Sequence, residues 1–245
     1  MDAENKNPDF SLLKRFTDKT SFDSNYSIVD ETDDFIVILK KNGIAVQVTD
    51  KESDDLESIL NAKYKEKVHV LNRIDQPVTG LVIFGKNKEF AAAFTEMLKA
   101  RTVKKVYLAL VAGTPEKGPV SLRHYIKKLH NRAMTADEPV DENFKEAVLE
   151  YTLLQSFNRY HLIRVDLKTG RFHQIRAQLA TMGMPIKGDL KYGSKRPNLD
   201  RSIGLLSYEL EFIHPFTGKK HAYKAPLPDN DELWNLVDRN ILIET

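Results

Sequence analysis

The chain has 245 residues, of which 41% are hydrophobic and 29% are charged, and its formal net charge is +2 at pH 7. This length suits one large domain or two small ones, and the composition is that of a globular protein with a sizeable core. The sequence contains no cysteine, which excludes disulfide bonds, thiolate nucleophiles and cysteine-ligated zinc. A surface that binds a polyanion would have to concentrate its positive charge locally.

The N-terminal segment, MDAENKNPDFSLLKRF, has no apolar core of the signal-peptide type. No apolar run in the chain approaches the roughly 18 residues that a membrane helix needs. We therefore expect a cytoplasmic protein without membrane contact, which the absence of cysteine also fits. Residues 1–25 are polar and lack strong periodicity, so we predict a loosely ordered N-terminal extension followed by one domain over 26–245.

The chain then alternates between β-branched apolar runs and amphipathic stretches. Residues 35–40 and 44–48 indicate two strands joined at Gly43, and 52–65 indicate a helix with acids in its first turn. Further strands are predicted at 68–71, 80–86, 104–113, 145–157, 160–167 and within 205–226, and further helices at 88–100, at 172–183 and near the C-terminus. Because strands outnumber the scattered helices, the pattern favours an α+β fold with a mixed, mainly antiparallel sheet.

Two of the predicted helices have an apolar stripe. The stripe of the helix at 88–100 consists of Phe90, Phe94, Met97 and Leu98, and that of the helix at 172–183 consists of Ile175, Leu179 and Met182. In the second helix, His173 and Arg176 are three residues apart and share a different face. Thr169 and Gly170 precede this helix, and free backbone N–H groups at its positive end would suit a phosphate or a carboxylate.

One short stretch, NRIDQPVTG at 72–80, places a single acid between two apolar strands. Asp75 could be a turn acid whose side chain caps nearby backbone N–H groups. Alternatively, the apolar flanks could place the turn over a cleft, where a partly desolvated carboxylate needs a cationic partner to keep its charge. A carboxylate nucleophile is held in this way.

Positive charge is concentrated in three places. The segment RFHQIR at 171–176 combines basic, amide and imidazole donors, although a solvated surface helix would explain it equally. Two other sets could be solvated or could form a phosphate-contacting rim: Lys99, Arg101, Lys104 and Lys105 ahead of Tyr107, and Lys187, Lys191, Lys195, Arg196 and Arg201. No second His or carboxylate stands at ligand spacing from His173, so no metal is expected. His214, in the turn at 214–218, is interpreted as structural.

Taken together, these stretches resemble the RluA-type pseudouridine synthases. RIDQPVTGL resembles the signature RLDxxTSGL, and LKTGRFHQIRAQLATMGMPIKGD resembles TGRxHQIRxxL followed by GxPIxGD. Three supporting segments, DDFIVILKKNGIAV, KKVYLALVAG and LEFIHPFTGKKHAYKAPLP, follow the family's order, so the likeness covers roughly residues 30–230. The resemblance implies a mainly antiparallel sheet bent around an RNA-binding cleft. It also implies cofactor-free isomerisation of a uridine in rRNA or tRNA to pseudouridine.

The resemblance also assigns roles by motif. Asp75 becomes the catalytic aspartate, Tyr107 lies against the target base, and Arg176 pairs with the Asp75 carboxylate. The expected substrate-binding residues are Arg73, Ile74, Thr79, Arg171, His173, Gln174 and Leu206, with Leu206 lining the pocket and Arg73 guarding the space of the flipped nucleotide. The domain at 26–245 is then the catalytic domain, without the S4 RNA-binding domain of many relatives. We expect a monomer, because no second apolar patch is evident.

Several positions depart from the family's pattern. Asn72 stands where His is usual, Val78-Thr79 replaces Thr-Ser, Lys41 replaces a proline, and LSY at 206–208 replaces LHA. These departures motivate an alternative, a catalytically silent RNA-binding protein on the same fold. A third hypothesis is a hydrolase with Asp75 and Asp189 as its carboxylate pair. Asp189, however, lies in IKGDLKYG and is better interpreted as a structural turn acid.

Overall fold

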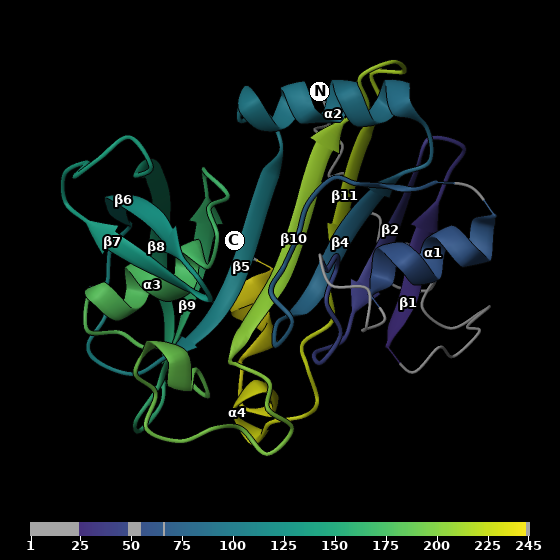
Figure 1. Cartoon of the computed structure of the whole chain (residues 1–245). Helices are drawn as coiled ribbons and strands as arrows, with labels where there is room; N and C mark the ends of the chain where they lie inside the picture. Colours follow the sequence, from purple (N-terminus) through teal and green to yellow (C-terminus); the bar gives the residue numbers. More distant parts are fainter. Residues whose placement is uncertain (1–24, 49–54, 66, 244–245) are drawn as a thin grey trace, which may run out of the picture.

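The computed structural model describes residues 25–48, 55–65 and 67–243 (Figure 1). The N-terminal extension predicted at 1–25 lies outside these residues, apart from residue 25. The helix predicted at 52–65 is described from residue 55 onward, and there it is helix α1 (Leu56–Tyr64). Asp55 caps α1, because its side chain accepts a hydrogen bond from the Ser58 backbone N–H.

The described strands form one 11-stranded mixed sheet. Its order is β1-β2-β4-β10-β5-β9-β8-β6-β7, with β3 paired to β4 and β11 paired to β10. The strands are β1 (Tyr26–Glu31), β2 (Phe35–Lys40), β3 (His69–Val70), β4 (Thr79–Gly85), β5 (Lys104–Val111), β6 (Val120–Leu129), β7 (Arg132–Ala136), β8 (Lys145–Ser156), β9 (His161–Leu167), β10 (Leu205–Ile213) and β11 (Lys220–Lys224). Of these pairings, β4 with β10 is parallel and the others are antiparallel. The predicted α+β class with a mainly antiparallel sheet is confirmed.

The strand pair predicted at 35–40 and 44–48 is wrong in its second member. Strand β2 pairs instead with β1 and with β4. After Lys40 the chain leaves the sheet, and Ala45 forms only an isolated bridge with Asp55. Ile44 and Val46 are buried in the core, so their apolar character reflects side-chain burial from a loop rather than strand pairing. The strands β6 and β7 were not predicted, because their sequence mixes charged and apolar residues without a clear apolar run.

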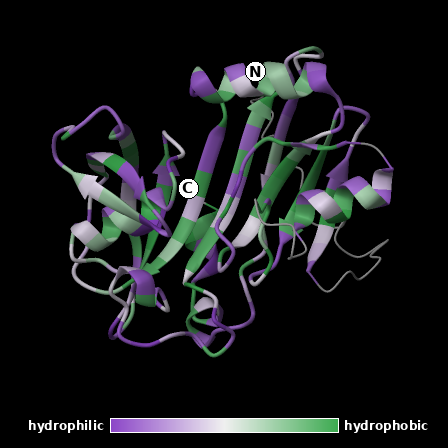
Figure 2. Ribbon diagram, in the orientation of Figure 1, coloured by the Kyte–Doolittle hydropathy of each residue, from purple (hydrophilic) through white to green (hydrophobic). Residues whose placement is uncertain are grey.

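The sheet is buried on both faces, because alternate residues of each strand point to opposite sides. Ile36 and Ile38 belong to one hydrophobic cluster, while Phe35 and Val37 belong to the other. Helices α1 and α3 (Gln174–Thr181) contribute side chains to the first cluster. Helices α2 (Lys88–Lys99) and α4 (Glu232–Asn235) contribute to the second. Apolar residues are concentrated in the central strands, and the connecting loops are largely hydrophilic (Figure 2).

The two helices with predicted stripes differ at their C-terminal ends. In α2, Phe90 and Phe94 are fully buried, and Met97 and Leu98 pack partly against the same cluster, as predicted. In α3, Ile175 and Leu179 are buried, but the side chain of Met182 is 46% exposed, so its predicted place in the stripe is wrong. The helix ends at Thr181 and Met182 is its C-cap, which takes this side chain off the buried face.

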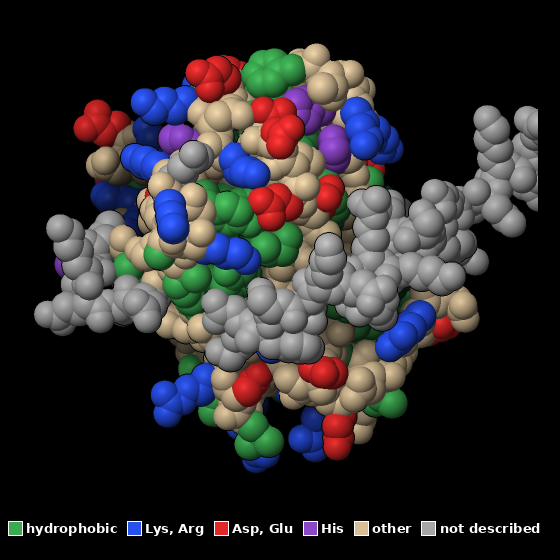
Figure 3. Space-filling model, turned by 90° about the vertical axis from the view of Figure 1, so that its right-hand side faces the viewer, with side chains coloured by type: hydrophobic (Ala, Val, Ile, Leu, Met, Phe, Trp, Pro, Cys, Tyr) green, Lys and Arg blue, Asp and Glu red, His purple; other side chains and the backbone are tan. Residues whose placement is uncertain are grey.

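The face that carries β1 and α1 mixes both signs of charge. Acidic and basic side chains are interspersed there rather than gathered into one patch of a single sign (Figure 3). Of the acidic stretch at 30–34, Glu31 and Asp33 are exposed, whereas Asp34 lies 3.1 Å from the buried His214. His214 thus has a structural partner at the edge of the second cluster, as the sequence indicated.

Candidate active site

Asp75 lies in a tight turn at the entrance to β4. The Val78 N–H donates to the Asp75 carbonyl at 3.0 Å, which closes the turn. The Ile203 N–H donates to the Pro77 carbonyl at 3.2 Å, and the Gly43 N–H donates to the Gln76 carbonyl at 2.9 Å. Two segments from other parts of the chain therefore hold the turn, and the Asp75 side chain remains 23% exposed.

A buried lysine supports the same turn from behind. Lys40 is fully buried, and its Nζ donates to the carbonyls of Lys41, Ile44 and Gln76 at 2.8, 2.9 and 3.1 Å. Burial lowers the pKa of Lys40 to about 7, although the nearby charge of Asp75 opposes this shift. Sequence analysis missed this residue, because a lysine at the end of an apolar strand is usually solvated.

Arg176 on α3 joins two carboxylates. Its Nη1 donates to Asp75 Oδ2 at 2.8 Å, while its Nε and Nη2 donate to the two oxygens of Asp189 at 2.7 and 2.8 Å. Burial alone would lower the pKa of Arg176, but the hydrogen bonds and charges of Asp189 and Asp75 raise it above its ordinary value. The ion pair between Arg176 and Asp75 that the resemblance implied is present, 101 residues apart in the chain.

This geometry also bears on the hydrolase hypothesis. Asp189 is buried, and both of its carboxylate oxygens accept from Arg176. A glycosidase needs one carboxyl group free to protonate a leaving group and a second one free to act on the sugar or on water. Asp189 instead anchors the arginine, so the pair Asp75 and Asp189 does not have the arrangement that this hypothesis requires. On the carboxylate of Asp75, the Oδ1 atom accepts no hydrogen bond from the part of the chain that the structure describes.

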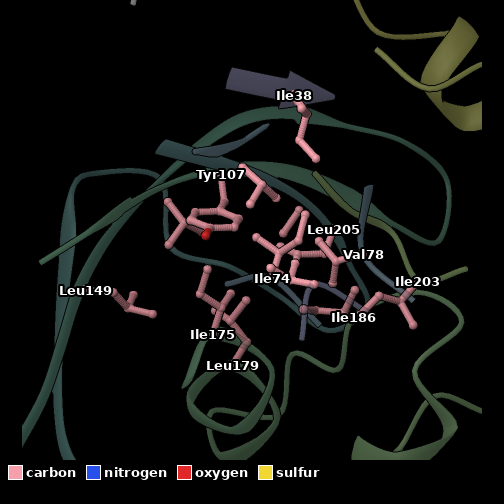
Figure 4. Close-up of a cluster of buried hydrophobic side chains, with 14 of the residues drawn as sticks. Ile38, Ile74, Val78, Tyr107, Leu149, Ile175, Leu179, Ile186, Ile203 and Leu205 are labelled. Atoms are coloured by element: carbon pink, nitrogen blue, oxygen red, sulfur yellow. The ribbon is translucent and has the colours of Figure 1, made fainter. Parts of the chain in front are cut away.

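Tyr107 lies on the same face of the sheet as α3. It is buried in the first cluster, which also contains Ile74, Val78 and Leu205 (Figure 4). Burial raises the pKa of Tyr107 to about 12, and the charge of Asp75 adds to the shift, while a hydrogen bond with Ser207 opposes it. The phenol is therefore protonated at neutral pH and can donate a proton, but it cannot act as a base there.

Leu206 was expected to line the pocket, and this expectation is wrong. Leu206 is fully buried in the second cluster, on the opposite side of the sheet from Tyr107. Its neighbours Leu205 and Ser207 point to the side of Tyr107, because successive residues of a strand alternate; Ser207 is the register partner of Tyr107. Ser207 also packs against Gly80, whose φ is +132° and where a Cβ would overlap the Ser207 backbone.

The turn before α3 is filled by the protein's own side chains. Gln174 is buried, and its Oε1 accepts from the Thr169 hydroxyl at 2.8 Å and from the Arg171 N–H at 2.9 Å. Its Nε2 donates to the Val148 carbonyl at 3.1 Å. The free N–H groups expected at this helix end are therefore partly used, and Gln174 supports the turn rather than facing the cleft.

His173 is the residue of this turn that reaches Asp75. Its Nε2 lies 3.7 Å from Asp75 Oδ2, and its ring stacks on Phe172 with centroids 3.8 Å apart. Its backbone has a φ of 51°, a left-handed conformation that is uncommon for a residue with a side chain. Burial, above all, lowers the pKa of His173 to about 4, so that the imidazole is neutral at pH 7.

The other predicted substrate-binding residues surround this centre. Ile74 is buried beside Tyr107, and the Thr79 side chain is half-buried at the start of β4. Arg73 and Arg171 are exposed: Arg73 Nη1 donates to the Gln47 side chain at 3.4 Å, and Arg171 Nε donates to the Glu146 carbonyl at 2.8 Å. Asn72 has a backbone partner, because its Oδ1 accepts from the Ile83 N–H at 2.8 Å.

The first basic set is largely neutralised by acidic side chains. In the first set, Lys99, Arg101 and Lys104 form ion pairs with Glu96, Glu146 and Glu209, respectively. Lys105 is the exception, because the described residues offer its Nζ no hydrogen bond or ion pair, and burial lowers its pKa. It stands two residues before Tyr107 on β5, which places both side chains on one face of the strand.

A cavity of about 510 Å³ opens beside the Asp75 turn. Pro77, Arg176 and Asp189 form one wall, and Leu199, Arg201 and Ile203 of the segment before β10 form another. Its size lies within the range of small-molecule and cofactor sites, about 300–1,000 Å³. Arg201, from the second basic set, brings a cation to this cavity.

Among the described residues, no group of three or more His, Cys, Asp or Glu is arranged to hold a metal ion. No helix of the described part is long and apolar enough to cross a membrane.

Comparison with solved structures defines the class of fold. The chain resembles the human RNA pseudouridylate synthase domain containing 4, with a TM-score of 0.67, 20% identity, and coverage of 82% of this chain and 88% of that one. It also resembles the human RNA pseudouridylate synthase domain containing 1, with a TM-score of 0.68, 24% identity, and coverage of 85% and 87%. The fold is that of the pseudouridine synthases.

Sequence comparison gives the family. The family described as RNA pseudouridylate synthase matches residues 34–181, and the chain belongs to this family. A ribosomal large subunit pseudouridine synthase D of Nitrosomonas europaea is 31% identical over 83% of this chain and 62% of its own length. An uncharacterized RNA pseudouridine synthase of Chloroflexus aurantiacus is 32% identical over 65% of this chain and 50% of its own length. The chain thus spans between half and two thirds of these two relatives.

Proposed function

We propose that the chain isomerises uridine in RNA to pseudouridine, with Asp75 as the residue that acts on the nucleotide. The observation that carries the proposal is the arrangement of Asp75, Arg176 and Tyr107. A carboxylate with one free oxygen is paired to a buried arginine and lies on the face of the sheet that presents a protonated tyrosine. Membership of the RNA pseudouridylate synthase family supports the same reaction.

The reaction needs an acid–base site but no redox chemistry. The N1–C1′ bond of uridine breaks, a C5–C1′ bond forms, the C5 proton is lost, and N1 gains a proton, so that substrate and product are isomers. Asp75 acts through Oδ1, while Oδ2 remains bound to Arg176. Attack on the sugar, attack on the base and abstraction of a sugar proton each require this free, ionised oxygen. The guanidinium of Arg176 compensates the charge of the carboxylate in every case.

The base has to leave the RNA stack before it can reach Asp75. Extrusion costs a few kcal/mol of unstacking and unpairing, and contacts in the pocket must offset this cost. We assign the contact with the base to the ring of Tyr107, which belongs with Ile74 and Val78 to the buried cluster beside the Asp75 turn. Stacking of a base on an aromatic ring contributes roughly 1–3 kcal/mol. To Arg73, whose side chain is exposed at the turn, we assign the role of occupying the space that the base leaves.

Lys105 is the cation that we assign to a phosphate of the bound nucleotide. A mostly buried cation without an anionic partner is costly, and a phosphate next to the flipped base would supply that partner. Replacing Lys105 by Met should weaken RNA binding and reduce the slope of log K against log salt by about one phosphate contact. Lys88→Met, at an exposed position of α2, is the matched control. An unchanged salt slope in the Lys105 variant would contradict this assignment.

For the substrate, we propose a uridine of large-subunit ribosomal RNA. Relatives from Nitrosomonas europaea and Haemophilus influenzae are named ribosomal large subunit pseudouridine synthase D, and the second is 29% identical over 89% of this chain and 74% of its own length. Mapping pseudouridines in RNA from cells with and without the gene tests the substrate. A site lost from ribosomal RNA supports the proposal, whereas a site lost only from transfer RNA overturns it.

Release of tritium from RNA labelled at C5 of uridine tests the activity directly. The wild-type chain should release tritium, and Asp75→Asn, which keeps the size but removes the charge, should release roughly 10³-fold less or none. Asp33→Asn, at an exposed position remote from the site, is the control and should match the wild type. Equal release by the Asp75 variant would overturn the role of Asp75. Salt-dependent RNA binding without any release would instead favour the silent RNA-binding protein that the departures at Asn72 and Ser207 suggest.

A further inference from the structure

Tyr192 forms the centre of a hydrogen-bond chain that ends at His173. Tyr192 belongs to the short 3-10 helix Leu190–Tyr192 and is buried. The backbone N–H of Ala133 on β7 donates to the Tyr192 hydroxyl oxygen at 2.6 Å. The same hydroxyl lies 2.9 Å from Nδ1 of His173. The family resemblance assigned no role to Tyr192.

The direction of this chain fixes which ring nitrogen of His173 carries a proton. The Ala133 N–H can only donate, so it occupies one lone pair of the Tyr192 oxygen. A buried hydroxyl proton needs an acceptor, and within the described part of the chain the Tyr192 hydroxyl has His173 Nδ1 as the partner that can accept this proton. Nδ1 is then the acceptor. Because burial lowers the pKa of His173 to about 4, the ring is neutral at pH 7 and its one proton is on Nε2.

The protonated nitrogen faces the site. Nε2 of His173 lies 3.7 Å from Asp75 Oδ2. This distance is too long for a hydrogen bond, but it means that a base bound beside Asp75 would also lie close to Nε2. The ring cannot easily turn away, because Phe172 stacks on it and Tyr192 packs against it edge-on, with centroids 5.6 Å apart. The backbone of His173 is left-handed, with φ at 51°. A strained position of this kind is kept only where the surroundings determine it.

We propose that Tyr192 is a positioning residue that holds His173 as the Nε2–H tautomer, so that this N–H donates to a carbonyl oxygen of the pyrimidine base bound beside Asp75. The proposal rests on the proposed function and deepens it by assigning a donor for the base. The cations nearby, Arg176 and Lys191, disfavour a second proton on the ring, while Asp75 and Asp189 favour it. The result is a neutral donor whose direction is set by a hydroxyl on another element.

The tautomer itself can be measured without any substrate. In protein labelled with 15N-histidine, long-range 1H–15N NMR spectra separate a protonated ring nitrogen from an unprotonated one. The wild-type chain at pH 7 should show His173 with unprotonated Nδ1 and protonated Nε2. In Tyr192→Phe, which keeps the ring and its contact with Arg176, Nδ1 loses its donor, and the signals should shift toward a mixture of both tautomers. A wild-type His173 protonated at Nδ1 would overturn the proposal.

Kinetics then test whether the tautomer matters. Tritium release by Tyr192→Phe should fall on the order of tenfold in kcat, the effect of one directed hydrogen bond, whereas Tyr64→Phe, which loses a hydroxyl contact to Glu31 on the other side of the molecule, should match the wild type. His173→Gln places an N–H donor where Nε2 stands, and His173→Asn places one where Nδ1 stands. The His173→Gln variant should therefore keep more activity than the His173→Asn variant. Adding Tyr192→Phe to His173→Gln should cause no further loss of activity.

This comparison separates a donor role from a structural one. Asn tolerates left-handed backbone better than Gln, so a purely structural role of His173 would make the Asn variant the milder change. That order of activities, or full activity in Tyr192→Phe, would overturn the proposal even if the variants fold less well. Failure of the proposed function is distinguishable, because a wild-type chain that shows the Nε2–H tautomer but releases no tritium would contradict the activity alone.

Discussion

Helices α2 and α3 pack on opposite faces of one sheet and illustrate two ways of holding a helix. Helix α2 buries apolar side chains, above all Phe90 and Phe94, and its charged residues face solvent. Helix α3 is buried over nearly its whole length, and the buried residues include Gln174, Arg176 and Gln178. The first arrangement depends on volume, and many apolar side chains could supply it. The second depends on specific partners for each buried polar group.

The helix starts differ in the same way. Asn87 caps α2 in an ordinary extended conformation, because its side chain accepts from the Phe90 N–H at 2.8 Å. The N-cap of α3 is His173, which is left-handed and makes no capping hydrogen bond with its side chain. That side chain instead lies near Asp75, with its Nε2 3.7 Å from Asp75 Oδ2. The site helix therefore departs from good local structure where the proposed chemistry needs a side chain.

Replacing Arg176 on α3 tests this contrast most severely. Arg176→Met should abolish tritium release and lower the free energy of unfolding by about 3–5 kcal/mol, because it leaves the buried Asp189 without its partner. Chemical denaturation and the release assay measure the two effects. The double variant Arg176→Met with Asp189→Leu should recover part of the stability but none of the activity. A single variant with wild-type stability would contradict the account of α3.

The matching change on α2 is Phe90→Ala. It should lower the free energy of unfolding by a similar amount, about 3–5 kcal/mol, through loss of burial and the cavity left behind. The molecules that remain folded should keep wild-type kcat, since α2 covers the face of the sheet opposite to Tyr107. Activity normalised to the folded fraction, measured by circular dichroism, checks this. A large loss of kcat would mean that the two faces are not independent.

Lys40 extends the comparison to a polar group buried behind the site. The pKa of Lys40 is about 7 in the folded chain, whereas its ordinary value, which applies to the unfolded chain, is 10.5. Between pH 7 and 10.5 the unfolded chain therefore binds more protons than the folded chain. The contribution of Lys40 to the free energy of unfolding should therefore rise with pH, by on the order of 2–4 kcal/mol from pH 7 to 10. Urea denaturation at both pH values should show this rise in the wild type relative to Lys40→Met. A difference that does not change with pH would contradict the shifted pKa.

The cap of α2 should give the smallest effect. Asn87→Ala removes the capping hydrogen bond and a second one, from Asn87 Nδ2 to Asp34 Oδ1, and should cost about 1–2 kcal/mol of stability, with no change in tritium release. Thermal unfolding and the release assay check the two parts. Asn87→Ser, which keeps a capping acceptor but loses the contact with Asp34, should fall between the Ala variant and the wild type. A loss of activity in the Ala variant would link the α2 face to the site.

The sequence by itself determined the features that depend on local pattern. The period of its apolar residues predicted most strands and the stripe of α2. The two long motifs indicated the family and the roles of Asp75 and Arg176, and a supporting motif indicated Tyr107. Patterns of this kind are local, because each one depends on residues within a few positions of one another. Residues 44–48, by contrast, have the pattern of a strand but form a loop that buries Ile44 and Val46, because burial and strand pairing select the same side chains.

The tertiary structure decided what depends on contacts between distant segments. Which face Leu206 occupies follows from the register of β10 against β5, and a shift of one residue reverses it. The roles of Lys40, Asp189 and Tyr192 follow from partners that the chain brings together only when folded. Their residue types are common in loops and at strand ends, so nothing local marks them. The role of a buried polar group depends on the group that forms its hydrogen bond or ion pair, and the fold determines which group that is.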